Sequence, residues 1–298
     1  MADLAITKAR GKSIPIHFLK SGEISGYENL SQIAKRWAKT NSFDGQEGRV
    51  LIVPNETGAM SCVLYGAGKD GSPLSTGALA SKLPKGRYRF ENSALDPHHS
   101  ALGWILGAYD FSRYRNRTDA EVKLVLSAEV DSEQLAREAE ATFLARDLIN
   151  TPANDMGPGE VESAIRKIAR AHKARVSVTK GDDLLKRNFP MIHAVGRAST
   201  DAPRLIDMKW GNAKDPKVTL VGKGVIFDTG GLNIKPGSSM ALMKKDMGGA
   251  ANTIALAQMI MDAKLPVQLR LLVPAVENAI SGNAFRPGDV LPSRKGLS

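Results

Sequence analysis

A long helix divides the sequence into two regions, each of which alternates strands with helices. The segment "DSEQLAREAEATFLARDLIN" (131–150) repeats leucine, alanine and phenylalanine at helical spacing, and Ser132 is placed to cap it. The helix must end before "TPANDMGPGE", because two closely spaced prolines prevent its continuation. We therefore predict an N-terminal domain over 1–128, a linker helix over 129–150 and a second domain over 151–298.

Both domains are predicted to be α/β. In the N-terminal domain, short apolar runs such as "RVLIVPN" (49–55) and "SCVLYGAG" (61–68) are separated by helical stretches. The second domain alternates apolar strands such as "PVQLRLLVPAVE" with the helix "GGAANTIALAQMIMDAK". Continuous apolar strands between helices indicate a mixed sheet that helices cover on both faces.

Composition limits the classes of protein that fit. The chain has 298 residues, of which 42% are hydrophobic, enough for two ordinary cores. It contains no apolar run of membrane-spanning length and its first residues lack a signal-peptide core, so a cytoplasmic protein without membrane contact is expected. Cys62 is the single cysteine. An internal disulfide and a thiolate zinc cluster are therefore excluded, and its apolar strand predicts a buried, inert thiol.

The net charge of +10 raises the question of nucleic-acid binding. The basic residues are spread along both halves of the chain. The densest runs, "SRYRNR" (112–117) and "RKIARAHKAR" (166–175), lack a recognisable motif, and the second is most simply the solvated face of a helix. Nucleic acid is therefore not favoured as a partner, although a nucleic-acid-binding or regulatory protein is kept as an alternative.

One glycine-rich stretch, "VGKGVIFDTGGLNIKPGSSMALMKKDMGGAAN", begins at Val221 and carries the functional signal. It is not a phosphate loop, because Lys223 is followed by Gly224 and not by Ser or Thr. It is not a dinucleotide fingerprint, because Phe227 stands where the third glycine belongs. The chain also contains no HExxH and no GxSxG, the motifs of histidine metallohydrolases and α/β-hydrolases.

Carboxylate chemistry remains. Asp228 follows an apolar strand, the place where α/β folds put their sites, and Asp246 opens a small-residue helix. Two carboxylates and a lysine beside a divalent cation form a coherent set, since the cation favours a neutral amine ligand. A second, protonated lysine could polarise a carbonyl. The alternative from spacing alone is a surface turn rich in Gly, Asp and Lys.

This stretch closely resembles the signature of the leucyl (cytosol) aminopeptidase family, the dimetal aminopeptidases called M17. Lys223, Asp228, Lys235 and Asp246 match four spaced positions within the same glycine frame. "ARDLINTPANDMGP" and "VPAVENAISGNAFRPGDVL" are also similar to family segments on either side of the site, and the N-terminal region is similar more weakly. The resemblance implies a smaller N-terminal α/β domain followed by a catalytic domain.

The resemblance also implies roles. Asp228 would bridge two divalent ions, and Lys223 and Asp246 would complete the position that receives the free amino terminus of a peptide. Lys235 would stay cationic and hold the scissile carbonyl oxygen while a metal-activated hydroxide attacks. Met243 would line the pocket for the first side chain, with plain packing as the alternative. The family uses two zinc or manganese ions and assembles as a hexamer.

The sequence departs from the family at its end. The family supplies further metal ligands and an arginine from an "NTDAEGR" motif after "RPGDV", and this chain contains no "DAEGR". The catalytic domain is thus expected to be incomplete, the chain an inactive fragment, and at most one ion weakly bound. A catalytically dead oligomerisation partner is the alternative.

Overall fold

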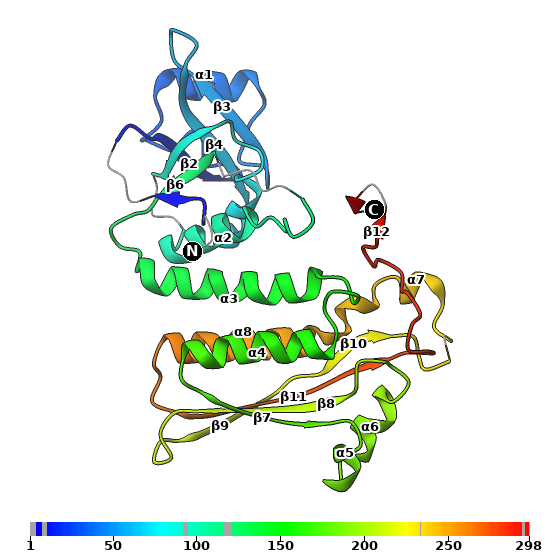
Figure 1. Cartoon of the computed structure of the whole chain (residues 1–298). Coiled ribbons are helices and arrows are strands. Elements are labelled where there is room, and N and C mark those ends of the chain that lie inside the picture. Colours follow the sequence, from blue (N-terminus) through cyan, green and yellow to red (C-terminus); the bar gives the residue numbers. More distant parts are fainter. Residues whose placement is uncertain are drawn as a thin grey trace. The chain divides into compact units, whose positions relative to one another are not determined.

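The structure is a computed structural model whose elements fall into two compact units (Figure 1). It describes residues 4–7, 11–91, 95–115, 121–232, 234–293 and 296–297. The first unit comprises residues 1–110 and 116–140. The second comprises Phe111–Arg115 and Ala141–Ser298. The division therefore falls within the helix that follows the first unit's last strand. The domain bounds 1–128, 129–150 and 151–298 stay a prediction.

The first unit is a six-stranded sheet with helices between its strands. Its elements are β1 Ile6–Thr7, β2 Ile14–Lys20, α1 Gln32–Thr40, β3 Val50–Pro54, β4 Met60–Gly68, η1 Pro73–Ala78, β5 Gly86–Phe90, α2 Pro97–Gly107 and β6 Val122–Val125. The strand order is β1-β6-β5-β2-β4-β3, and every neighbouring pair is parallel except β3 with β4. The predicted α/β class is confirmed for this part of the chain.

Local signals account for the helices of this unit. The side chain of Ser31 caps α1 by accepting from the Ala34 amide at 3.1 Å, and Asp96 caps α2 through the His99 amide at 2.7 Å. Cys62 is buried among apolar side chains, and burial raises the pKa of its thiol to about 11. The prediction of a buried thiol is confirmed, and at neutral pH such a thiol stays protonated.

The predicted linker helix is α3, Ser132–Asn150. The expected cap is wrong by one residue: the side chain of Asp131 accepts from the amides of Glu133 and Gln134 at 2.9 and 3.1 Å. A carboxylate accepts these amides more strongly than a hydroxyl and also suits the positive end of the helix dipole. Ser132 is then the first helical residue.

The second unit is built on a mixed five-stranded sheet. Its elements are α4 Pro158–Ala171, β7 Arg175–Lys180, α5 Asp183–Lys186, α6 Pro190–Gly196, β8 Arg204–Trp210, β9 Lys217–Val221, β10 Gly224–Asp228, α7 Gly237–Met240, η2 Met243–Met247, α8 Gly248–Asp262 and β11 Gln268–Asn278, with the small hairpin β12 Pro292–Ser293 and β13 Gly296–Leu297. The order is β10-β11-β8-β7, and β9 also pairs with β11. β9 and β10 run parallel to β11, whereas β8 is antiparallel to both of its neighbours.

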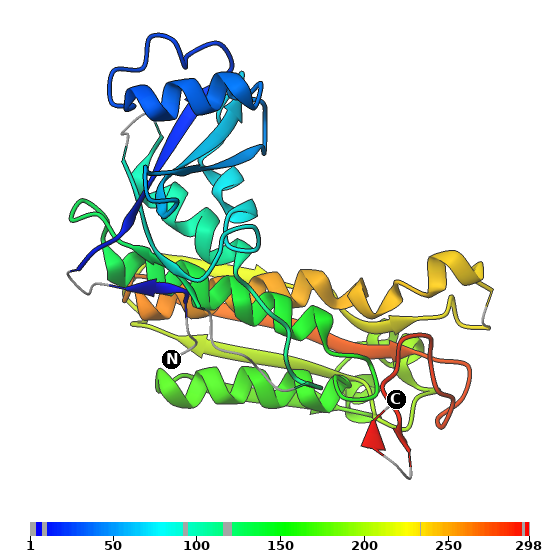
Figure 2. The same cartoon turned by 90° about the horizontal axis from the view of Figure 1, so that it is seen from above.

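Helices cover both faces of this sheet, as predicted. α4 and α8 run along the strands on one face, and α5 and α6 lie on the other face near one end (Figures 1 and 2). α4 and α8 contribute fully buried side chains, among them Ile165 and Ile254, to a core with Leu271 and Val273 of the central strand. The rigid core places the ends of β10 and β11 side by side.

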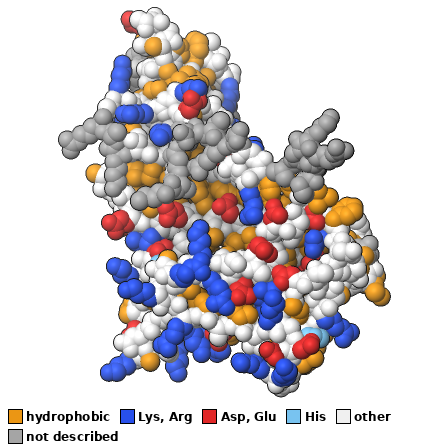
Figure 3. Space-filling view, in the orientation of Figure 1, with side chains coloured by type: hydrophobic (Ala, Val, Ile, Leu, Met, Phe, Trp, Pro, Cys, Tyr) orange, Lys and Arg blue, Asp and Glu red, His pale blue; other side chains and the backbone are white. Residues whose placement is uncertain are grey.

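Two findings bear on partners. Among the described residues, no helix has both the length and the apolar character needed to cross a bilayer. On the face that Figure 3 shows, Lys and Arg side chains are interspersed with Asp and Glu over the described part of the second unit. Since nucleic-acid modules concentrate positive charge, this surface does not favour the nucleic-acid alternative.

Candidate metal centre

Lys223, the first candidate site residue, lies in a break between the strands β9 and β10. β9 and β10 both pair with β11, and Gly222 and Lys223 interrupt them. Gly222 packs against α8: a Cβ there would lie 2.2 Å from the Thr253 hydroxyl and 2.7 Å from the Ala250 Cα. The Ala250 amide donates to the Lys223 carbonyl at 2.9 Å. Strand irregularities of this kind re-aim side chains, and glycine permits the close approach of the helix.

Lys223 and Asp246 form the first of two ion pairs. Lys223 Nζ donates to Asp246 Oδ1 at 2.9 Å, although the lysine side chain is 61% exposed. Asp246 lies in η2 and its Oδ2 is buried without a hydrogen-bond partner among the described residues. A buried carboxylate oxygen without a partner is costly, so this atom marks a place where a further group would be stabilising.

Asp228 and Lys235 form the second ion pair. Lys235 Nζ lies 2.5 Å from Asp228 Oδ2, and Asp228 Oδ1 accepts from the Gly230 amide at 3.0 Å and from Asn278 Nδ2 at 2.7 Å. Burial raises the pKa of Asp228, but the hydrogen bonds from Lys235, Gly230 and Asn278 outweigh it and hold the pKa below its usual value. Asp228 therefore stays ionised at neutral pH. Gly230, at φ +83°, allows the chain to turn back so that Lys235 reaches the carboxylate.

Two further side chains lie beside these pairs. Lys235 Nζ also lies 3.4 Å from Met243 Sδ, which brings the predicted pocket residue next to the cationic lysine. Lys244 donates to the Asn150 carbonyl at 3.0 Å and so binds the end of α3. Met243 also packs against the main core of its unit. Its role in substrate binding stays a prediction.

The side chains fit a divalent cation. The described residues hold no group of three or more His, Cys, Asp or Glu side chains suited to a metal, and the candidate centre consists of two carboxylates and two lysines. Lys223 and the partnerless Asp246 Oδ2 offer a nitrogen and an oxygen. Asp228, at the end of β10, is the second carboxylate, and Lys235, Gly230 and Asn278 engage its oxygens. In this structure the two ammonium groups supply the positive charge that these carboxylates require.

Asn278 is the site residue that spacing did not identify. It ends β11 and lies opposite Asp228 in the parallel register of β10 and β11. Adjacent parallel strands end at the same edge of a sheet, so a polar residue closing the neighbouring strand was the available signal. Its amide orients one oxygen of Asp228, as outer partners of metal ligands commonly do.

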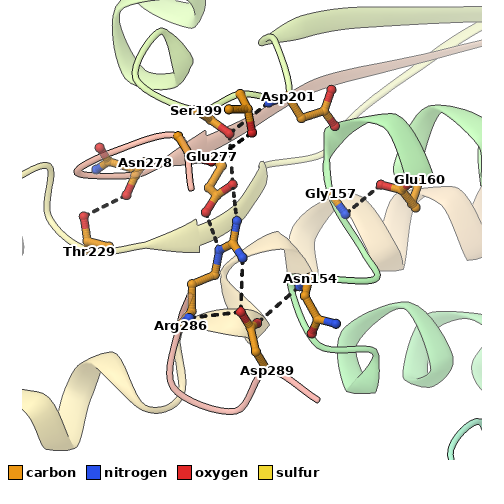
Figure 4. Close-up of polar contacts among 12 residues, drawn as sticks. Asn154, Gly157, Glu160, Ser199, Asp201, Thr229, Glu277, Asn278, Arg286 and Asp289 are labelled. Carbon is orange, nitrogen blue, oxygen red and sulfur yellow. Dashed lines mark hydrogen bonds and ion pairs between the residues drawn. The ribbon is translucent and has the colours of Figure 1, made fainter. Parts of the chain in front are cut away.

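A polar network fixes the chain after β11 (Figure 4). Glu277 is 4% exposed and forms an ion pair with Arg286, which also bonds Asp289 at 3.2 Å. Asp289 accepts from the Asn154 amide at 3.2 Å, and the Asn154 side chain pairs with the backbone of Val290. These hydrogen bonds join the segment before the glycine-rich stretch, which contains Asn154, directly to the segment after it, which contains Asp289 and Val290. Glu277 precedes Asn278, so the same network holds the end of β11.

Two family profiles match the chain. The catalytic domain of the cytosol aminopeptidase family matches residues 143–298, and the N-terminal domain of the M17 aminopeptidases matches residues 14–127. Among curated proteins, a probable cytosol aminopeptidase 1 of Shewanella oneidensis is 34% identical over 87% of this chain and 56% of its own length. A probable cytosol aminopeptidase of Wolinella succinogenes is 31% identical over 95% and 65%.

Solved structures give the same result. The cytosol aminopeptidase of Coxiella burnetii superimposes with a TM-score of 0.86 at 41% identity, over 99% of this chain and 65% of that one. The bottromycin maturation enzyme BotP, in complex with Mn, has a TM-score of 0.75 at 27% identity, over 95% and 64%. This chain spans 56–65% of the length of these four proteins.

Proposed function

Because the chain belongs to the cytosol aminopeptidase family, we propose that the whole protein is a metallo-aminopeptidase that removes N-terminal residues from peptides. The observation that carries this proposal is the pairing of Lys223 with Asp246 and of Lys235 with Asp228 at the ends of β10 and η2, with one oxygen of Asp246 left without a partner. The fold of the relatives supports it.

The residues divide into those that hold a cation and one that acts on the substrate. Lys223, Asp228 and Asp246 would hold divalent metal, which when bound supplies Lewis-acid chemistry at the peptide carbonyl. Lys235, which forms an ion pair with Asp228, would donate to the oxygen of the scissile carbonyl. Asn278 fixes the orientation of Asp228. Met243, beside Lys235, would contact the first side chain of the peptide.

Finer points follow from the family. Manganese is the metal that we favour, since a solved relative is described in complex with Mn, and zinc is equally compatible with oxygen and amine ligands. We propose two metal ions in the whole protein and at most one, weakly held, in these 298 residues. A homo-hexamer in the cytoplasm is proposed from the names and family of the relatives.

The test is hydrolysis of L-leucine anilide by the complete product of the gene with Mn²⁺. Lys235→Met should lower kcat by about 10²–10³-fold, the cost of losing one oxyanion donor, with little change in the folded structure. Lys245→Met is the matched control, because Lys245 is exposed on the same short helix as Asp246 and should retain full activity.

Asp228→Ala and Asp246→Ala should each abolish turnover and weaken metal binding. Wild-type turnover in both carboxylate variants would remove the assignment of this site. Absence of turnover from the wild-type gene product would favour the catalytically dead oligomerisation partner.

A further inference from the structure

The first unit contains a cavity of about 310 Å³ that the aminopeptidase site does not use. All of its lining residues belong to the first unit. Phe18, Phe90, Leu124 and Val130 supply apolar walls, and α2 contributes Ser100 from its first turn. A cavity of this volume is at the lower end of the range in which small-molecule ligands bind.

The cavity lies where this sheet is expected to bind ligands. β2 and β5 are parallel neighbours in the sheet. After β2 the chain continues to β3 and β4 on one side of the pair, whereas after β5 it continues to β6 on the other side. The lining comes from Phe18 of β2, from the ends of β5 and β6, and from the start of α2, so the cavity adjoins the point where the strand order reverses. In open α/β sheets this crevice, at the reversal of strand order, is the usual binding position.

Ser100 provides a second, independent observation. It is 2% exposed and lines the cavity, and its hydroxyl has no hydrogen-bond partner among the described residues. Its carbonyl is already occupied, because the Thr76 hydroxyl donates to it at 2.7 Å. A hydroxyl buried without a partner costs free energy, so this wall of the cavity carries a polar group whose hydrogen-bonding capacity is unused.

Charged groups of both signs meet at the rim. Arg89 forms an ion pair with Glu91 and donates through one terminal nitrogen to the Ser13 carbonyl. Within the described part of the chain these contacts leave its Nε–H without a partner, and guanidinium groups bind carboxylates well. Glu129 lies at the same rim and is exposed. Arg89 could therefore bind a carboxylate of a ligand, and Glu91 and Glu129 could bind an ammonium group of the same ligand.

We propose that this cavity binds a free α-amino acid with an apolar side chain. The side chain would occupy the space between the two phenylalanines and Leu124, while the carboxylate meets Arg89 and the ammonium group meets Glu91 and Glu129. Such a molecule matches the apolar interior and the mixed-charge rim together. The proposal requires neither a metal nor any activity of the second unit.

The test is calorimetric titration of the metal-free chain, in EDTA, with L-leucine and L-phenylalanine. One molecule should bind per chain, with a dissociation constant below about 1 mM. 3-Methylbutylamine, which lacks the carboxylate, and 4-methylpentanoate, which lacks the amine, should each bind at least about tenfold more weakly than leucine, because each loses one charged contact. Equal binding of either analogue would overturn the assignment to amino acids.

Variants locate the binding. Arg89→Met should weaken leucine binding at least about tenfold, whereas Arg87→Met, an exposed arginine on the same strand outside the cavity, should leave it unchanged. Val130→Trp should abolish binding by filling the space. Ser100→Ala should weaken binding while leaving the urea midpoint unchanged or higher, since it removes a hydroxyl without a partner.

The outcome is independent of the aminopeptidase site. Asp246→Asn should leave leucine binding in EDTA intact, although it should impair metal binding. Loss of leucine binding in Asp246→Asn, or wild-type affinity in both Arg89→Met and Val130→Trp, would overturn the proposal. So would failure of both amino acids to bind at about 10 mM.

Discussion

At the scale of single residues, the candidate centre is organised by the partners of Asp228. One of its oxygens accepts from Asn278 and Gly230, and the other pairs with Lys235. These contacts hold the carboxylate ionised and in a fixed orientation. Lys235 occupies the second oxygen, so a cation that bound Asp228 there would have to displace the lysine.

Removal of the Asn278 amide tests this organisation. Asn278→Ala should weaken the binding of Mn²⁺ by the complete protein by about 10–100-fold, because Asp228 loses the donor that orients it. Titration calorimetry measures the effect. Asn283→Ala, an exposed asparagine in the loop that follows, is the control and should bind as the wild type does. Equal affinities of all three proteins would contradict the role of Asn278.

The ion pair of Asp228 should also appear in the pH dependence of stability. Its folded pKa lies below the ordinary value of 3.8, so its contribution is complete above that value and is lost as the pH falls through the folded pKa. Lys235→Met should therefore lower the urea midpoint more at pH 6 than at pH 3. An equal loss at both values would mean that the pair does not stabilise the fold.

At the scale of elements, two joints, meaning contacts between distant segments, position the candidate site. One is the packing of Gly222, in the break between β9 and β10, against α8, and the other is the polar network after β11. The first depends on Gly222, because any Cβ there meets the helix. The second depends on a nearly buried ion pair between Glu277 and Arg286. Both joints bring together segments far apart in the chain.

The strand break predicts a stability effect. Gly222→Ala should destabilise the protein by about 1–3 kcal/mol, because its Cβ would overlap Thr253 and Ala250 and force α8 to shift. Gly237→Ala is the matched control, since a Cβ at that position meets nothing within 4 Å. Urea unfolding followed by circular dichroism compares the two. Equal urea midpoints of the two variants would show that α8 accommodates the added Cβ without loss of stability.

The polar network predicts a larger effect. Arg286→Met would leave Glu277, 4% exposed, as a buried charge without its cation, at a cost of about 3–5 kcal/mol. Arg270→Met removes an ion pair of which the arginine is 46% exposed, and should cost less than about 1 kcal/mol. Urea midpoints test the contrast, and limited proteolysis should cut the loop after β11 faster in Arg286→Met only. Similar behaviour of the two variants would contradict the network's role.

At the scale of the whole molecule, sequence patterns predicted the α/β class and the long helix α3, and they singled out the four residues that form the two ion pairs. They did not predict how those four residues pair. The pairing of Lys235 with Asp228 depends on the turn at Gly230, and that of Lys223 with Asp246 depends on the packing of α8 at Gly222. Pairings of this kind arise from contacts between elements and not from spacing along one.

The register of β11 against β10 and the burial of Ser100 could not be predicted from the sequence either. Asn278 reaches Asp228 only because β11 is aligned with β10 by its long pairing with β8 and β9. Ser100 resembles any helical serine until the cavity around α2 is formed. The cap at Asp131 was missed by one residue because aspartate and serine both suit that position.

The account depends on a divalent cation binding at Lys223, Asp228 and Asp246. The most direct measurement is a Mn²⁺ titration of the complete protein followed by electron paramagnetic resonance, in which bound Mn²⁺ loses the six-line signal of the free ion. The wild type and Asp183→Asn, a change in an exposed carboxylate on α5, should bind alike. Asp246→Asn should bind at least about tenfold more weakly. Identical titrations of the wild type and Asp246→Asn would contradict the assignment.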